Sequence, residues 1–315
     1  MSYPLRLEDP KEVYHISSRT IGSKLWFVNN KPLNYAILAY LAKYSELYEA
    51  KLYSFILMGN HYHLIAKFPK MNKAAFMRSF NAIIAKLVGT KVETFKDGHL
   101  WSRRYSDQVL LGNKSIEHWW FYCALNPVTS GIARTLREYE SYNSFSDAVS
   151  GRSKEFKVFE RWKYNEARHR FGKVDKRDFI KNYSLKFARL EAYEEMEQVD
   201  YKKMMWEKLE ERRVVAVEER LKKGLGFATE ENRKKVKPGA RPRKTKKLDK
   251  GGFTPIVLCL CTKTKYEYLE KYFIIVNNHY EVSEKYRAGD LSVEFPPGTY
   301  RPPCLCLPEG LEAVE

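Results

Sequence analysis

The sequence predicts an α+β fold in which helices flank an antiparallel sheet, followed by a mainly helical extension and a small terminal α+β segment. Residues 13–20 alternate apolar and polar side chains and are rich in β-branched and aromatic types, which is typical of a strand. Two further strand-like runs, 52–58 and 61–68, are separated only by Gly59 and Asn60. Such a short, turn-compatible connection predicts a tight antiparallel hairpin.

Helical patterns occupy the intervals between these strands. A helix is expected at about 33–48, after Pro32, and a second from the N-cap Asn72 to the closing Gly89. A fourth strand at 105–111 leads to a third helix, which we expect Ser115 to cap and Pro127 to end or kink. The order β-α-β-β-α-β-α predicts an α+β sandwich.

Composition changes along the chain and suggests four parts. Residues 1–150 form the first domain, and 151–230 form a densely charged helical extension. Residues 231–251 read as a flexible basic linker or arm, because Lys and Arg dominate and Gly and Pro interrupt regular structure. Residues 252–315 form a small region of unknown role, expected to contain a strand, a short helix and a strand.

The charge balance indicates a polyanionic partner. The 315 residues include 56 Lys plus Arg against 39 Asp plus Glu, a formal net charge of +17. Nucleic acid is the first partner to test, and a merely soluble basic protein is the alternative. The N-terminus lacks the apolar core of a secretory signal, and no apolar run approaches the ~18 residues of a membrane span. We therefore expect a cytoplasmic protein without a membrane partner, whose five cysteines are reduced.

Two spacings bring together residues that can carry chemistry. His61 and His63 alternate with Tyr62, so on a strand both imidazoles point to one side, about 7 Å apart, and could share a metal ion. Surface or packing histidines are the alternative. Tyr122 and Asn126 are four residues apart and would lie on one helical face. With 22 tyrosines in the chain, packing is the alternative for any one of them.

Four segments, in this order, carry a resemblance to a known family: VYHISSRT, FILMGNHYHLI, LWSRRYSDQVL and FYCALNPVTSGIA. Over roughly residues 10 to 150 the chain resembles the REP-associated tyrosine transposases. These are relatives of the single-tyrosine insertion-sequence transposases within the His-hydrophobe-His endonucleases. The resemblance implies a ferredoxin- or RRM-like core and makes 1–150 the catalytic domain. Gly59 departs from the family, which commonly has proline before Asn-His.

The resemblance also implies a mechanism. His61 and His63 match the metal ligands, Asn126 occupies the place of a third ligand, and Tyr122 matches the nucleophile. The implied activity is metal-dependent nicking and strand transfer of single-stranded DNA through a 5′-phosphotyrosine, on hairpin or palindromic DNA such as REP elements. Mg²⁺ or Mn²⁺ is the implied cofactor, and the implied location is the nucleoid.

Further DNA contacts are expected from two clusters. Near the site these are Arg19, Trp101, Arg103, Arg104 and Tyr105, where splayed bases could stack on the aromatic rings and phosphates could meet the arginines. Core packing is the alternative for the two rings, and a solvated face for the arginines. In the basic arm the candidates for salt-dependent phosphate binding are Arg233, Lys234, Lys235, Arg241, Arg243 and Lys244, with an unengaged linker as the alternative.

Other interpretations remain open at this point. The chain could be a domesticated protein that binds DNA hairpins with vestigial cleavage activity, or a replication initiator or relaxase of the same superfamily. It could act as a monomer or a homodimer. The Cys-x-Cys pairs at 259/261 and 304/306 are read as ordinary core cysteines rather than a zinc site. His15 is read as a packed or hydrogen-bonded strand histidine rather than a neighbour of the site.

Overall fold

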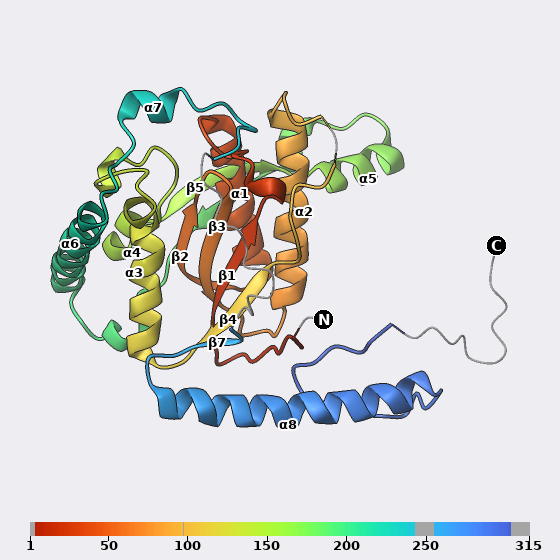
Figure 1. The fold of residues 1–315 in the computed structure, drawn as a ribbon. Helices are drawn as coiled ribbons and strands as arrows, with labels where there is room; N and C mark the ends of the chain where they lie inside the picture. Colours follow the sequence, from red (N-terminus) through yellow and green to blue (C-terminus); the bar gives the residue numbers. More distant parts are fainter. Residues whose placement is uncertain (1–3, 97, 243–254, 304–315) are drawn as a thin grey trace.

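A five-stranded sheet in the order β2-β3-β1-β4-β7 forms the centre of the computed structural model, which describes residues 4–96, 98–242 and 255–303 (Figure 1). The central strand β1 pairs antiparallel with β3 and β4, and β2 pairs antiparallel with β3. The edge strand β7 runs parallel to β4. The predicted α+β class is confirmed, but the sheet is mixed and not purely antiparallel. The strands are β1 Val13–Arg19, β2 Lys51–Leu57, β3 His61–Lys67, β4 Ser106–Leu110 and β7 Val257–Leu258.

Helices cover both faces of this sheet. The helices α1 (Lys31–Leu47) and α2 (Lys73–Lys91) lie on one face, and α3 (Asn113–Thr129) lies on the other (Figure 1). Successive residues of β3 reach opposite layers: the hydroxyl of Tyr62 donates to Asn81 Oδ1 of α2, whereas His63 contacts α3. The alternation expected along this strand is confirmed.

The helix ends differ in detail from the prediction. Asn72 precedes α2, but its side chain donates to the carbonyl of Tyr48 and does not cap the helix. Ser115 lies inside α3, where its Oγ accepts from the backbone N–H of Leu260. The third helix also continues through Pro127 to Thr129.

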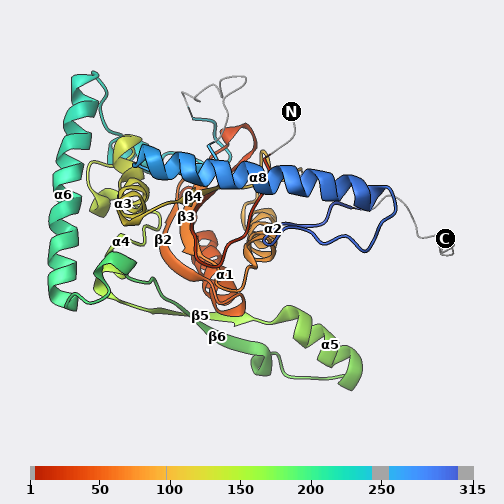
Figure 2. The same ribbon diagram turned by 90° about the horizontal axis from the view of Figure 1, so that it is seen from below.

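The region after residue 150 contains strands as well as helices. A two-stranded sheet pairs β5 (Lys154–Phe159) with β6 (Ile180–Leu185), and together with α5 it extends away from the central sheet (Figure 2). The long helix α6 packs on α3 through four buried side chains spaced along one face: Tyr201, Met205, Leu209 and Val217. The remaining elements are α4 Phe145–Ser150, α5 Arg161–Phe171, α6 Gln198–Lys222, α7 Glu230–Lys234 and the short helices η1 Ile21–Ser23, η2 Leu136–Glu138, η3 Lys176–Phe179 and η4 Glu191–Tyr193.

A single long helix replaces the predicted short helix and strand near the C-terminus. Helix α8 (Thr262–Arg287) crosses below the sheet (Figure 1) and buries Tyr272, whose hydroxyl donates to the carbonyl of Leu5. The apolar run at 273–276 suggested a strand, yet Phe273 and Ile274 are largely exposed on the helix. A short apolar run does not separate helix from strand, and here tertiary contacts decide. None of the described helices has the length and apolarity that a membrane crossing requires.

An ion network joins α3 to α6. Lys208 Nζ and Arg212 Nη2 each lie 3.0 Å from a carboxylate oxygen of Glu117, which also accepts a hydrogen bond from Tyr193. The guanidinium of Arg212 lies 3.9 Å above the centre of the Phe121 ring. These partners outweigh the effect of burial and hold the pKa of Glu117 below its ordinary value. The network thus fixes α6 to the helix that carries Tyr122.

Replacing Glu117 with Gln is expected to destabilise the protein by about 1–2 kcal/mol at neutral pH, because charged hydrogen bonds to two cations are lost. The pKa of this carboxyl is lower in the folded than in the unfolded state. Its contribution to stability is therefore fully present above pH 4.5 and disappears as the pH falls through the lowered pKa. Urea unfolding of both proteins checks this, and the difference should shrink in acid. The exposed Glu207→Gln on α6 is the matched control; an equal loss there would contradict the prediction.

The segment expected to be a flexible basic arm is partly folded. Arg233 lies in α7 and donates to the carbonyls of Ile132 and Ala228, while Lys234 and Lys235 pair with glutamates one turn earlier. Further on, the N–H of Gly239 donates to the carbonyl of Leu25. The prediction of a free arm is therefore wrong up to residue 242. Backbone carbonyls and nearby glutamates pair with these basic side chains, which the charge pattern of the sequence does not reveal.

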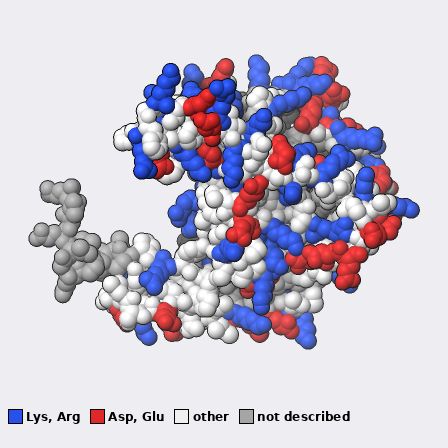
Figure 3. All heavy atoms as spheres, turned by 180° about the vertical axis from the view of Figure 1, so that it is seen from behind, with Lys and Arg blue, Asp and Glu red and all other residues white. Residues whose placement is uncertain are grey.

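The remaining arm residues and the surface charge complete this description. Arg241 is exposed, whereas Arg243 and Lys244 lie outside the described residues. On the face drawn in Figure 3, basic side chains are interspersed with acidic ones and do not form one continuous basic surface. Net charge alone therefore does not define a DNA path on that face.

Candidate active site

The two histidines of β3 lie on the side of the sheet that faces α3. His63 is buried, His61 is half-buried, and their ring centres are 5.0 Å apart. In the neighbouring strand, Arg19 is the register partner of His61. Strands β3 and β1 therefore place both imidazoles and Arg19 near one end of the sheet, and the alternating pattern predicted this for the histidines.

Helix α3 brings Tyr122 and Asn126 to the same place. The ring centre of Tyr122 lies 5.7 Å from that of His63, and this tyrosine is 38% exposed. Asn126 is buried, with its Nδ2 3.3 Å from His63 Nε2. The hydroxyl of Ser130 donates to Asn126 Oδ1. The amide oxygen thus points away from His63, and Asn126 would have to turn its amide to serve as a third metal ligand.

His15 belongs to the same cluster. Its Nε2 lies 2.9 Å from His63 Nδ1, and its Nδ1 lies 3.0 Å from Gln108 Oε1. The sequence interpretation of a hydrogen-bonded strand histidine is right, but His15 is also a neighbour of the site, which that interpretation set aside. Because β1 pairs His15 with Ile65, His63 lies on the diagonal two residues away. Only the strand register reveals this contact, and the register is not visible in the sequence.

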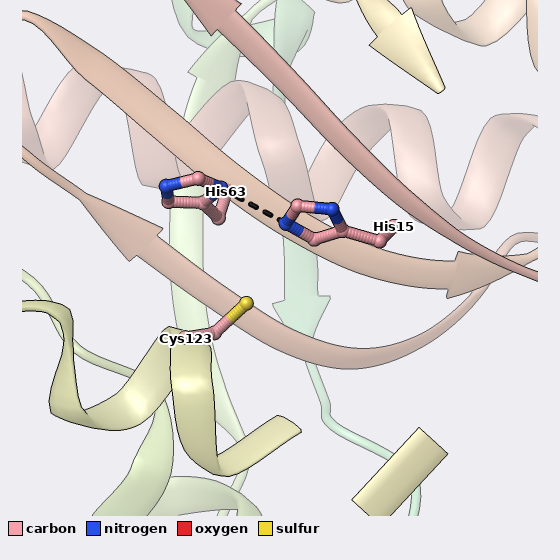
Figure 4. A group of neighbouring side chains, drawn as sticks. All are labelled: His15, His63 and Cys123. Carbon is pink, nitrogen blue, oxygen red and sulfur yellow. Dashed lines mark hydrogen bonds between the residues drawn. The ribbon is translucent and has the colours of Figure 1, made fainter. Parts of the chain in front are cut away.

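A buried group of His15, His63 and Cys123 could bind a metal ion. Their potential ligand atoms all lie within 4.8 Å of one another, and Figure 4 shows the Cys123 sulfur directed toward the hydrogen-bonded histidine pair. Burial raises the pKa of the Cys123 thiol, which favours the protonated form. Since a metal binds the thiolate, occupation of this position would require loss of that proton and of the bond between the two histidines.

Burial keeps the histidines in the form that binds metals. It lowers the pKa of His61 to about 3, with a further contribution from Arg19, and lowers the pKa of His63 well below its ordinary value. The pKa of His15 falls to about 4 for the same reason. A neutral imidazole offers one nitrogen lone pair, so the donor set at His61 and His63 fits a divalent cation.

The phenol of Tyr122 experiences opposing influences. Burial raises its pKa, as does the neighbouring Cys123, whereas the charge of Arg19 and a hydrogen bond with Asn126 lower it. The charge of Arg19 thus lowers the pKa of both Tyr122 and His61. It stands where a negative phenolate or phosphate would be stabilised.

Of the two aromatic residues predicted to stack on DNA bases, Tyr105 is buried and Trp101 is half-buried against the core. Trp101 donates from its ring nitrogen to the carbonyl of Asn81, and its ring lies against Phe27 and Tyr62. The ring of Tyr105 is covered by the guanidinium of Arg6 at 3.7 Å. These contacts cover part of each ring, which the sequence does not show, and stacking on DNA bases stays a prediction. Arg103 and Arg104, in contrast, are exposed beside them.

Packing explains why glycine stands before Asn60 in the hairpin turn. A Cβ at Gly59 would lie 2.9 Å from Val28 Cγ1 and 3.0 Å from Leu25 Cδ2. The carbonyl of Gly59 also accepts from the N–H of Phe27. Leu25 and Val28, which follow η1, therefore leave too little room for a side chain at this position.

A comparison with protein-family models gives one match for the part of the chain that carries the histidine pair and Tyr122. Residues 12–122 match the family model described as "Transposase IS200 like", which ends at Tyr122. This part of the chain is therefore similar to the IS200-like transposases.

Solved structures give weaker similarities. A REP-associated tyrosine transposase bound to a REP hairpin is 16% identical, with a TM-score of 0.39, over 48% of this chain and 87% of that one. A crystal structure of a Deinococcus radiodurans R1 protein assigned as a transposase is 16% identical, with a TM-score of 0.28, over 39% of this chain and 92% of that one. No curated protein matches the chain.

Proposed function

We propose that this protein nicks single-stranded DNA and transfers the cut end through a covalent link to Tyr122. The observation that carries the proposal is the convergence of Tyr122 with His63 and Asn126, from α3 and β3, at one half-exposed position. The match of residues 12–122 to a transposase family model supports the same reaction class. The preferred substrate is DNA with an unpaired strand at the cut, because the attacked phosphate must reach a phenol beside the sheet.

In the proposed reaction the Tyr122 oxygen attacks phosphorus. An O–P bond forms to the tyrosine, the bond to the 3′-oxygen breaks, the phenol proton goes to solvent and the leaving 3′-oxygen takes one up. The 5′ end stays on the protein, and a second 3′-hydroxyl can attack the link to rejoin strands without ATP. Arg19 favours the phenolate. A divalent cation, Mg²⁺ or Mn²⁺, held by His61 and His63 supplies positive charge to the non-bridging phosphate oxygens.

Covalent trapping tests the proposal. Incubating the protein with end-labelled hairpin DNA that carries single-stranded flanks, in Mn²⁺, is expected to give a protein–DNA adduct that survives a denaturing gel. Tyr122→Phe should give none, because it lacks the attacking oxygen, whereas the exposed Tyr35→Phe should react like the wild type. An adduct that persists in Tyr122→Phe would refute the assigned nucleophile.

The second candidate function is a DNA-hairpin-binding protein with vestigial cleavage. Two observations favour it. Burial favours the protonated thiol of Cys123, and Asn126 turns its amide nitrogen toward His63, so neither residue presents a ligand atom to a metal. Tight hairpin binding by the wild type, with no adduct across a library of hairpin sequences and with Mg²⁺ or Mn²⁺, would establish this function instead.

A further inference from the structure

A chain of hydrogen bonds joins four side chains from four different elements of the site. Gln108 Oε1 of β4 lies 3.0 Å from His15 Nδ1 of β1, and His15 Nε2 lies 2.9 Å from His63 Nδ1 of β3. His63 Nε2 in turn lies 3.3 Å from Asn126 Nδ2 of α3. His15, His63 and Asn126 are all buried, so water does not compete for these bonds.

Gln108, at one end of this series of hydrogen bonds, determines which nitrogen of each histidine carries the proton. An amide oxygen only accepts, so His15 must carry its proton on Nδ1 to donate to Gln108. A neutral imidazole has one donor and one acceptor, and His15 Nε2 is therefore the acceptor. His63 must then donate from Nδ1, which leaves the lone pair of His63 on Nε2.

Asn126, at the other end of the hydrogen-bond series, independently requires the same proton positions. The hydroxyl of Ser130 donates to Asn126 Oδ1, which turns the amide nitrogen of Asn126 toward His63. An amide nitrogen only donates, so His63 Nε2 must accept. Both ends therefore require one arrangement of protons. The stacked rings of His15 and His63, inclined by 16°, also hold the plane of the second imidazole.

We propose that Gln108 and His15 are positioning residues that keep the lone pair of His63 on Nε2, the nitrogen directed toward Asn126. The inference rests on the proposed function of His63 as a metal ligand. A ligating histidine is ordinarily oriented through its other ring nitrogen by a carboxylate, a carbonyl or water. Here a second histidine does this, and a glutamine fixes the proton of that histidine in turn.

Side-chain NMR of the metal-free protein tests the tautomers directly. Long-range ¹H–¹⁵N spectra should show His63 protonated on Nδ1 and His15 protonated on Nδ1. Gln108→Met, which is similar in shape but lacks the accepting oxygen, leaves only the Asn126 end to hold this direction and should raise the fraction of the reversed tautomer at both rings. A wild-type spectrum with the His63 proton on Nε2 would overturn the inference, because both ends of the chain would then be reversed.

Mn²⁺ titration of the full-length protein gives the second measurement. Gln108→Met and His15→Leu should weaken binding by about 10- to 100-fold, the effect expected of an orienting partner. His15→Gln offers an oxygen to His63 Nδ1 and should bind Mn²⁺ more tightly than His15→Leu. Equal weakening by His15→Gln and His15→Leu, or unchanged binding in Gln108→Met, would overturn the inference.

One further variant separates this inference from the proposed function. His63→Ala removes the ligand itself and should abolish Mn²⁺ binding. If Mn²⁺ still binds to His63→Ala with wild-type affinity, the proposed role of His63 fails. If binding is lost in His63→Ala but Gln108→Met is unaffected, only the role of Gln108 and His15 fails.

Discussion

Replacing His63 with alanine is expected to lower the rate of DNA cleavage by about 1,000-fold or more. The substitution removes the imidazole shared by both candidate metal positions and the partner of Asn126. Loss of several kcal/mol of charge stabilisation at the phosphate accounts for an effect of this size. Single-turnover cleavage of the labelled hairpin measures the rate, and circular dichroism checks that the variant is folded.

The matched control is His118→Ala, which removes an exposed imidazole from the same helix as Tyr122. It should cleave at nearly the wild-type rate. Cleavage by His63→Ala within about tenfold of the wild type, a difference worth about 1.4 kcal/mol, would contradict a metal-dependent role for this residue.

The largest effect on stability is expected from Asp107→Asn. Lys73 is 1% exposed, and its ammonium lies 2.7 Å from an Asp107 oxygen, while Arg6 Nε lies 3.1 Å from the other. Burial lowers the pKa of Lys73, and the charge of Asp107 opposes this. Removing the carboxylate leaves a buried cation without its counter-charge, which costs about 3–5 kcal/mol. Urea unfolding measures the loss.

Removing both members of this pair should cost far less than removing one. In Lys73→Met with Asp107→Leu, apolar side chains replace the two charges, so no unpaired ion is left in the core. A double variant that is less stable than Asp107→Asn would show that shape, and not charge, dominates at this position.

Three strands of the central sheet could be predicted because each has a recognisable local sequence pattern. The alternation at 13–20 and the short turn at Gly59–Asn60 specify β1, β2 and β3 without any knowledge of the rest. Helix α8 was not predictable in this way. Its apolar run fits either a helix or a strand, and the choice depends on contacts such as that of Tyr272 with Leu5.

The candidate site was predictable only where one element holds both residues. Periodicity alone places His61 with His63 on one strand, and Tyr122 with Asn126 on one helix. The contact of His15 with His63 depends on the register of two strands, which the sequence does not contain. The packing of Trp101 against Phe27 likewise depends on a long-range contact.

The parallel strand β7 links the order of synthesis to the assembly of the sheet. The residues proposed to react have all left the ribosome well before Val257 and Leu258, which cover the outer edge of β4. Until then that edge offers unpaired backbone groups, a template on which strands of other chains can pair. A nascent chain would thus hold its proposed catalytic residues while this edge of its sheet was still open to aggregation, until β7 pairs with β4.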